Sequence, residues 1–270
     1  MTSLLATAQG AVTPLLPLAA VFAGLAIATK RRGVLAAFHA CRREAATNAG
    51  LFMVNYVLLA PMLLLAAAAL ANLVAPPAAL AALWSRLPEL ATLLIAMLLI
   101  DIAAYWRHRA GHLPELWRYH ATHHADEALH WFSVTRKHPV DKLIELLADT
   151  LPALLIGMPL WAIAGAQLLR SWWGFFIHAD LPWTLGPLKR VLISPAAHRL
   201  HHIRDEALMG TNFANTFAFV DLMFGTFADP TPHVHCPTGI AEGTRGVVGE
   251  PARPWERRYR KRAVEAPLAS

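Results

Sequence analysis

The sequence predicts an all-α integral membrane protein, a helical bundle with a cytoplasmic helical cap that carries clustered histidines. Three observations support this fold class. First, 56% of the 270 residues are apolar and 16% are charged, whereas about a quarter of the residues are charged in an ordinary soluble domain. Second, the apolar residues gather in uncharged runs of membrane length. Third, most of the 14 histidines recur at helical spacing outside those runs.

Residues 1–100 are expected to form the N-terminal transmembrane helices. The first span is residues 11–29, which carry no charge and approach the ~20 residues needed to cross a bilayer. Because residues 1–10 contain no Lys or Arg, we expect an uncleaved anchor rather than a secretory signal. A second span is expected from residue 49 to about residue 74, and a third over residues 87–106.

The rest of the chain divides into two parts. Residues 101–229 form the expected histidine-bearing domain, and residues 143–177 within it are mostly apolar apart from a Gly-Met-Pro interruption at 157–159. This pattern predicts a helical hairpin that enters the membrane and returns. Residues 230–270 lack apolar periodicity and end in a basic run. This pattern indicates a basic C-terminal tail that either lies at the lipid headgroups or is partly disordered.

The basic residues between the first two spans predict the orientation. Residues 30–43 hold five Lys and Arg residues, and such loops face the cytoplasm. Three crossings then leave the N-terminus outside and the histidines on the cytoplasmic side of a multi-pass protein. The net charge of +6 suits an anionic membrane surface better than nucleic acid in a chain of this composition.

The histidines form three boxes of the types HxxxH and HxxHH. Spacings of three and four residues place the members of a box on one side of a helix, where they can meet at one point. Composition alone predicts about 0.04 occurrences of HxxHH, yet the sequence contains two. The boxes are His108 and His112, then His120, His123 and His124, then His198, His201 and His202.

Eight imidazoles exceed the four to six donors that one ion takes, so two metal ions are implied. The chain's cysteines are Cys41 and Cys236, which are too far apart in sequence for a thiolate zinc site, and blue copper requires a cysteine ligand. The Glu-x-x-His pairs of carboxylate-bridged di-iron bundles do not accompany the boxes. A histidine-rich dinuclear iron site fits these donors best, and zinc can substitute for iron.

These motifs resemble the fatty acid hydroxylase / sterol desaturase superfamily of integral membrane di-iron oxygenases. The resemblance rests on DIAAYWRHR at 101–109, on the three boxes HRAGH, HATHH and HRLHH, on Lys-His-Pro at 137–139 and on FGTF at 224–227. It covers nearly half of the chain. It implies that two iron ions are bound by the eight boxed histidines together with His178.

Four further residues receive provisional roles. Asp101 and Asp221 are expected to accept the free ring N–H of a ligating imidazole. His130 is an extra ligand, a donor to a ligand, a substrate contact or a structural residue, and these alternatives stay open. His138, which precedes a proline, is expected to cap or pack against a helix. His39, His233 and His235 lie outside the boxes and are not expected to bind metal.

The resemblance implies a lipid monooxygenase that hydroxylates an unactivated C–H bond, for example in a sterol or a fatty acyl chain, with O2 and two electrons. No GxGxxG motif or cysteine cluster is present, so the electrons are expected from an external ferredoxin or cytochrome with its reductase. Two alternatives remain: a lipid desaturase, and a non-catalytic membrane protein that binds metal. No nucleic-acid partner is expected.

Overall fold

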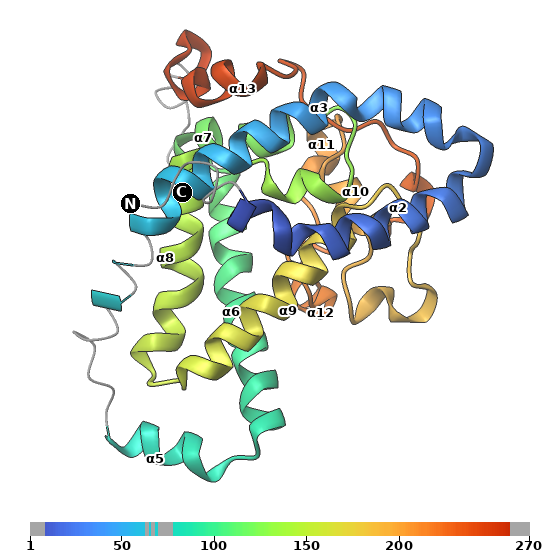
Figure 1. Cartoon of the computed structure of the whole chain (residues 1–270). Coiled ribbons are helices and arrows are strands. Elements are labelled where there is room, and N and C mark those ends of the chain that lie inside the picture. Colours follow the sequence, from blue (N-terminus) through green and yellow to red (C-terminus); the bar gives the residue numbers. More distant parts are fainter. Residues whose placement is uncertain (1–8, 63–64, 66–67, 70–77, 260–270) are drawn as a thin grey trace.

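The computed structural model describes residues 9–62, 65, 68–69 and 78–259. In this part of the chain the secondary structure is helical, apart from one isolated antiparallel bridge between Ile203 and Thr238. Figure 1 shows two regions: α6, α8 and α9 form an elongated bundle, and shorter helices gather at one end of it. The expected all-α fold class is thereby confirmed.

The N-terminal part is one helical segment from Gln9 to Met62, long and apolar enough to cross a membrane. It comprises η1 (Thr13–Leu15), α2 (Leu16–Lys30), η2 (Arg31–Gly33), α3 (Val34–Val54) and a π-helical turn, η3 (Asn55–Leu59). The chain reverses direction between α2 and α3 (Figure 1).

The expected loop over residues 30–43 is mostly wrong, because residues 34–43 belong to α3. The buried residues of α3 and η3 are Glu44, Thr47, Asn48, Leu51 and Asn55. Their spacing of three and four residues makes a mainly polar stripe, which packs on the cap. The second predicted span begins in the middle of α3, and part of it, including residues 70–74, lies outside the described residues.

The bundle contains the second helix long enough to span a membrane, α6 (Glu89–Gly111). It follows α5 (Ala78–Arg86) and packs against α8 (Pro139–Leu155) and α9 (Leu160–His178). Small residues in the contact let the helix backbones approach closely; they are Ala96, Ala153, Ala162 and Ala166. The predicted hairpin break is confirmed: α8 ends before Gly157, whose φ of 70° suits a glycine turn.

Large apolar side chains cover the outer surface of this bundle. Those exposed on α8 and α9 are Leu143, Leu147, Leu155, Leu160, Trp161, Leu168, Leu169 and Trp172. An apolar surface of this extent is unusual on a soluble monomer and is typical of a lipid-facing or protein-facing helix.

The cap consists of short helices with local start signals. They are α7 (Pro114–His124), η4 (Trp131–Thr135), η5 (Gly186–Arg190), α10 (Pro195–His201), α11 (Glu206–Met209) and α12 (Ala218–Met223). The C-terminal segment, residues 230–259, adds η6 (Thr231–His233), α13 (Gly246–Gly249) and η7 (Glu250–Trp255). For example, Ser194 accepts a hydrogen bond from Ala197 N at 3.0 Å and Pro195 takes the first helical position, a favoured N-terminus.

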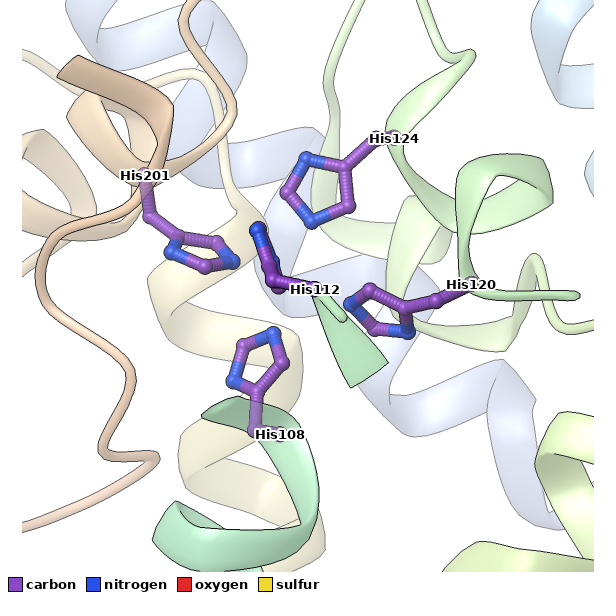
Figure 2. A group of neighbouring side chains, drawn as sticks. All are labelled: His108, His112, His120, His124 and His201. Carbon is purple, nitrogen blue, oxygen red and sulfur yellow. The ribbon is translucent and has the colours of Figure 1, made fainter. Parts of the chain in front are cut away.

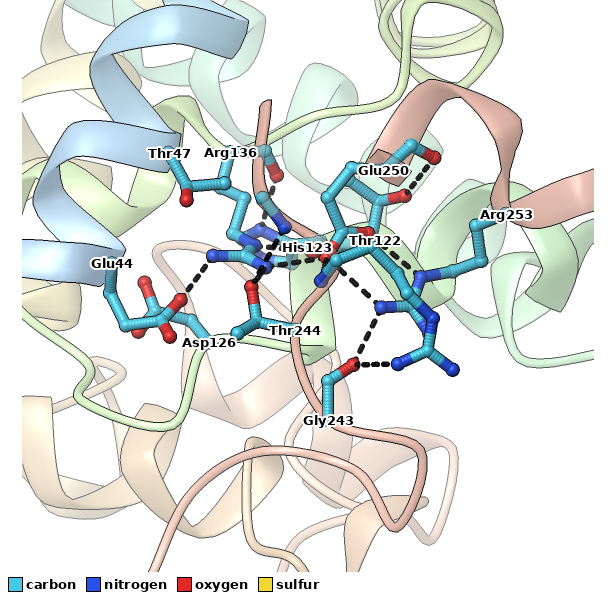
Figure 3. Close-up of polar contacts among 12 residues, drawn as sticks. Glu44, Thr47, Thr122, His123, Asp126, Arg136, Gly243, Thr244, Glu250 and Arg253 are labelled. Carbon is cyan, nitrogen blue, oxygen red and sulfur yellow. Dashed lines mark hydrogen bonds and ion pairs between the residues drawn. The ribbon is translucent and has the colours of Figure 1, made fainter. Parts of the chain in front are cut away.

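Residues 230–259 fold onto the cap, so partial disorder is wrong over this stretch, while the expected placement of the tail at the lipid headgroups stays a prediction. Residues 260–270 lie outside the described residues. Tyr259 and Arg253 are fully buried. Figure 3 shows the reason: Arg136 pairs with Glu44 of α3 and Glu250 of η7, and Glu250 also pairs with Arg253. Since a buried guanidinium must be paired, this network joins α3, the cap and the C-terminal segment.

Candidate metal centre

Four helix ends bring the predicted ligands together. His108 lies in the last turn of α6 and His112 caps that helix; the second box ends α7, the third ends α10, and His178 ends α9. Pro114 favours the extended conformation of Leu113, which separates α6 from α7. A Cβ on Gly111 would lie 3.2 Å from His120 Cγ, so glycine allows α7 to fold back closely.

The nine histidines form two separate groups, each with donor atoms within 4.8 Å of one another. The five-histidine group comprises His108, His112, His120, His124 and His201, and the four-histidine group comprises His123, His178, His198 and His202. Figure 2 shows the imidazoles of the five-histidine group turned toward a common centre. The structure thus brings together every residue predicted as a ligand, while ligation itself stays a prediction.

Each HxxHH box contributes to both groups. In the second box the first and last histidines join the five-histidine group and the middle one joins the other. In the third box the assignment is reversed. Residues i and i+4 lie about 40° apart around a helix, whereas i+3 and i+4 lie about 100° apart, so neighbouring histidines point to different centres.

Backbone carbonyls orient several imidazoles. In the five-histidine group, His108 Nδ1 lies 2.7 Å from the Phe213 carbonyl and His201 Nδ1 lies 2.7 Å from the Thr211 carbonyl. In the four-histidine group, His178 Nδ1 contacts the Gly174 carbonyl at 2.7 Å and His123 Nδ1 the Arg136 carbonyl at 3.1 Å. A carbonyl only accepts, so each Nδ1 donates and each Nε2 carries a free lone pair.

The free nitrogens fit metal ions. In the five-histidine group, the buried Nε2 atoms of His108, His112, His120 and His201, and both ring nitrogens of His124, have no hydrogen-bond partner among the described residues. Buried polar atoms seldom stay unpaired, and nitrogen lone pairs that converge on one point suit a cation there. The site therefore has the donors of a metal centre.

The four-histidine group fits even more closely. Its Nε2 atoms are 3.4 Å apart between His178 and His123, 3.0 Å between His198 and His178 and 3.2 Å between His202 and His198. Four nitrogens about 2.05 Å from one ion in a tetrahedral arrangement are about 3.3 Å apart. Three of the six nitrogen pairs therefore already have the spacing of a tetrahedral coordination shell, and all four donors lie within 4.8 Å of one another.

Burial keeps the cap histidines neutral. It lowers the pKa of His201 to about 3 and holds the pKa values of His123, His124, His198 and His202 well below the ordinary range. Neutral imidazole is the form that binds metal. Among the described residues, the carboxylate that contacts one of these nine imidazoles is Asp141, 3.3 Å from His120 Nδ1.

Asp101 and Asp221 do not contact an imidazole in the described part of the chain, so the predicted contacts are wrong. Asp101 accepts from Thr216 N and Phe217 N and pairs with Arg170. Asp221 accepts from Phe213 N and Ala214 N. Both acids instead anchor the loop 211–217, whose carbonyls at 211 and 213 orient two histidines. They therefore act on the five-histidine group through the backbone.

His130 and His138 lie outside both groups. His130 caps η4, accepting from Phe132 N at 3.4 Å, and its Nε2 lies 3.2 Å from Asn48 Nδ2. His138 caps α8 by accepting from Val140 N at 3.1 Å, which confirms its expected capping role. Asp141 and the orienting carbonyls were not predicted from the sequence. Asp141 follows the Lys-His-Pro motif, but a backbone carbonyl has no sequence signature.

The fold and site define a helical protein with two largely buried all-histidine groups that could hold metal ions, beside a bundle with a membrane-length helix. Residues 93–226 match the sequence profile of the Fatty acid hydroxylase family. The chain therefore contains a fatty acid hydroxylase domain and belongs to the fatty acid hydroxylase superfamily, which confirms the resemblance.

Curated relatives agree with this assignment. The chain is 27% identical over 172 residues to ornithine lipid hydroxylase OlsE of Rhizobium tropici, covering 63% of this chain and 52% of the relative. It is 34% identical over 142 residues to alkylglycerol monooxygenase of Danio rerio, covering 52% and 31%. It is also 28% identical over 152 residues to a Delta(7)-sterol 5(6)-desaturase of Gibberella zeae, covering 56% and 45%. The matches thus span about half or less of each relative. No solved structure matches the chain.

Proposed function

We propose that this protein is a membrane-bound di-iron oxygenase that hydroxylates an unactivated C–H bond of a lipid with O2 and two external electrons. The observation that carries the proposal is the division of nine histidines, seven of them buried, into two groups with free, converging nitrogens. Relatives named lipid hydroxylases, monooxygenases and desaturases support an oxygen-dependent oxidoreductase.

The five-histidine and four-histidine groups would each hold one iron ion. Bound iron supplies the reduction of O2 and the oxidation of the C–H bond. The chain's own residues orient the imidazoles through backbone carbonyls and keep them neutral by burial. Electrons come from a ferredoxin or cytochrome with its reductase.

Purified protein tests the proposal directly. We expect the purified protein to contain about two iron ions per chain. Cells that carry the gene should form a lipid alcohol that cells without the gene lack, and this alcohol should contain ¹⁸O when the cells are supplied with ¹⁸O2. One ion per chain at full activity would refute the dinuclear site. An alkene product with no ¹⁸O would instead support a desaturase, which the similarity to a sterol desaturase makes the second candidate.

The proposed topology has the histidine cap on the cytoplasmic side and residues 1–10 outside. The basic stretch at residues 30–43 supports this orientation even though most of it is helical. Single cysteines at Ser3 and Glu206 test it in a background where both natural cysteines are replaced by serine; Glu206 is suitable because it is exposed on the cap surface. Impermeant reagents applied from outside should label Ser3→Cys and spare Glu206→Cys, and labelling of both would refute the orientation.

A further inference from the structure

A cavity of about 500 Å³ opens beside both histidine groups. It lies between α3 with η3 on one side and α8 and α9 on the other, and α6 contributes to its wall. Histidines of both groups line it, namely His108, His123, His178 and His198. If the protein is the proposed oxygenase, on which this inference rests, the cavity is where a substrate meets the centre.

Part of the cavity wall is apolar. Phe52, Val134, Leu146, Ile163 and Phe175 line it, and a volume of this size accepts a drug-sized molecule or a length of acyl chain. An apolar segment of a lipid would cover these side chains, and this burial would stabilise the complex by about 25 cal/mol per Å² of apolar surface removed from water.

The same wall is highly charged. It contains four cations, Arg107, Lys137, Lys142 and Arg170, but two carboxylates, Glu145 and Asp149. Asp101, behind the wall, pairs with Arg170 at 3.1 Å. The ion pairs therefore hold one cation in excess, because the remaining nearby acid, Asp141, contacts His120 rather than one of these cations.

The two lysines locate that excess charge. Lys137 and Lys142 share one carboxylate, with Nζ–O distances of 2.7 and 2.5 Å to the two oxygens of Glu145. Across the cavity Asp149 pairs closely with Arg107 at 2.7 Å and more distantly with Arg170 at 3.9 Å, and Arg170 also has Asp101. Each ammonium has three donors, and the Lys142 side chain is 38% exposed, so the lysine pair can accept a second anion.

We propose that the cavity binds an amphiphile whose head carries anionic oxygens, a carboxylate or a phosphate, at Lys137 and Lys142, while its apolar part lies along Phe52, Leu146 and Phe175. Buried ionisable groups in a membrane-type bundle are costly and usually mark a substrate path. An anionic head compensates the excess charge, whereas a neutral or cationic head does not.

Binding of matched amphiphiles tests this proposal. The probes are dodecyl phosphate, dodecanoate and dodecanol, titrated into metal-loaded full-length protein in neutral maltoside micelles and followed by calorimetry. The wild-type protein should bind both anionic probes about tenfold more tightly than dodecanol, which corresponds to about 1.4 kcal/mol. Inorganic phosphate, lacking the chain, should bind at least tenfold more weakly than dodecyl phosphate.

Substitutions with opposite expected effects separate recognition from structure. Lys142→Met keeps the apolar stem and should abolish the preference for an anionic head. Glu145→Gln removes the competing carboxylate and should strengthen that preference. Lys189→Met is the matched control, because Lys189 pairs with exposed Asp229 on the surface and lies outside the residues that line the cavity.

Three results would each overturn the proposal. The wild-type protein could bind the anionic probes and dodecanol equally, or it could bind inorganic phosphate as tightly as dodecyl phosphate. Alternatively, Glu145→Gln could weaken the binding of the anionic probes as Lys142→Met does. Metal content and ¹⁸O incorporation measured on the same preparations separate the two proposals. Two ions and labelled product without a head-group preference would refute the anionic substrate alone.

Discussion

Asp221→Asn should weaken one metal site and leave the other intact. The Asp221 carboxylate accepts from Phe213 N at 2.7 Å, Ala214 N at 3.0 Å and Thr226 Oγ1 at 2.7 Å, and the residue is fully buried. An amide has one acceptor oxygen, and its NH2 group would face a backbone N–H. At least one buried donor then loses its partner.

The magnitude follows from those contacts. A hydrogen bond to a charged group contributes about 1.5–3 kcal/mol, and the second anchor of the loop, Asp101, remains in place. The Phe213 carbonyl would therefore shift rather than the loop unfold, and loss of an orienting contact of this kind lowers metal affinity about 10–100-fold. The four-histidine group is oriented by carbonyls at Gly174 and Arg136, so it should keep its ion.

Metal content during chelator titration measures the effect. Wild-type protein should retain about two ions where the variant retains about one, and the loss should follow two phases. Asp229→Asn is the matched control because Asp229 is half exposed and pairs with Lys189 at the surface. Simultaneous loss of both ions, or retention equal to that of the control, would refute the idea that Asp221 supports the five-histidine group alone.

Three further predictions follow. His201→Ala and His202→Ala should each leave about one ion per chain by elemental analysis, from different groups, and each should abolish lipid oxidation; loss of both ions from either variant would contradict the division. Arg136→Met should lower the unfolding free energy by about 3–5 kcal/mol because it leaves buried Glu44 unpaired. The control Arg204→Met, at an exposed ion pair, should lower it by under about 1 kcal/mol. Similar denaturant midpoints for the two variants would be evidence against this. In the metal-free protein the lowered pKa of His201 means that, as the pH falls, His201 is protonated in the unfolded chain before it is protonated in the folded protein. The unfolding free energy should therefore be full above pH ~6.5 and fall toward pH 3 by up to about 1.4 kcal/mol per pH unit. Equal unfolding free energies at pH 7 and pH 5 would contradict this.

Much of the fold was predictable from local patterns. The hairpin break near Gly157, the membrane-length helix around residues 87–106 and the cap at His138 each depend on a run of neighbouring residues. The errors concern segments whose partners are distant in sequence. Residues 34–43 are helical, and Glu44 packs against Arg136 far along the chain. Residues 230–259 lack periodicity, and scattered contacts hold them: Cys236, Ile240 and Tyr259 join an apolar cluster, and Glu250 and Arg253 belong to the buried ionic network.

The amino-acid sequence alone indicates which eight boxed histidines can gather, because spacings of three and four residues on short helices place imidazoles on one side of each helix. Their division into two centres depends on the tertiary structure. In each HxxHH box the middle histidine joins a different centre from the other two, and which centre that is depends on how α6, α7, α9 and α10 meet. Likewise, Asp101 and Asp221 were recognisable as candidate site acids, but their partners are backbone N–H groups of a loop 115 and 8 residues away, and no pattern of side chains encodes such contacts.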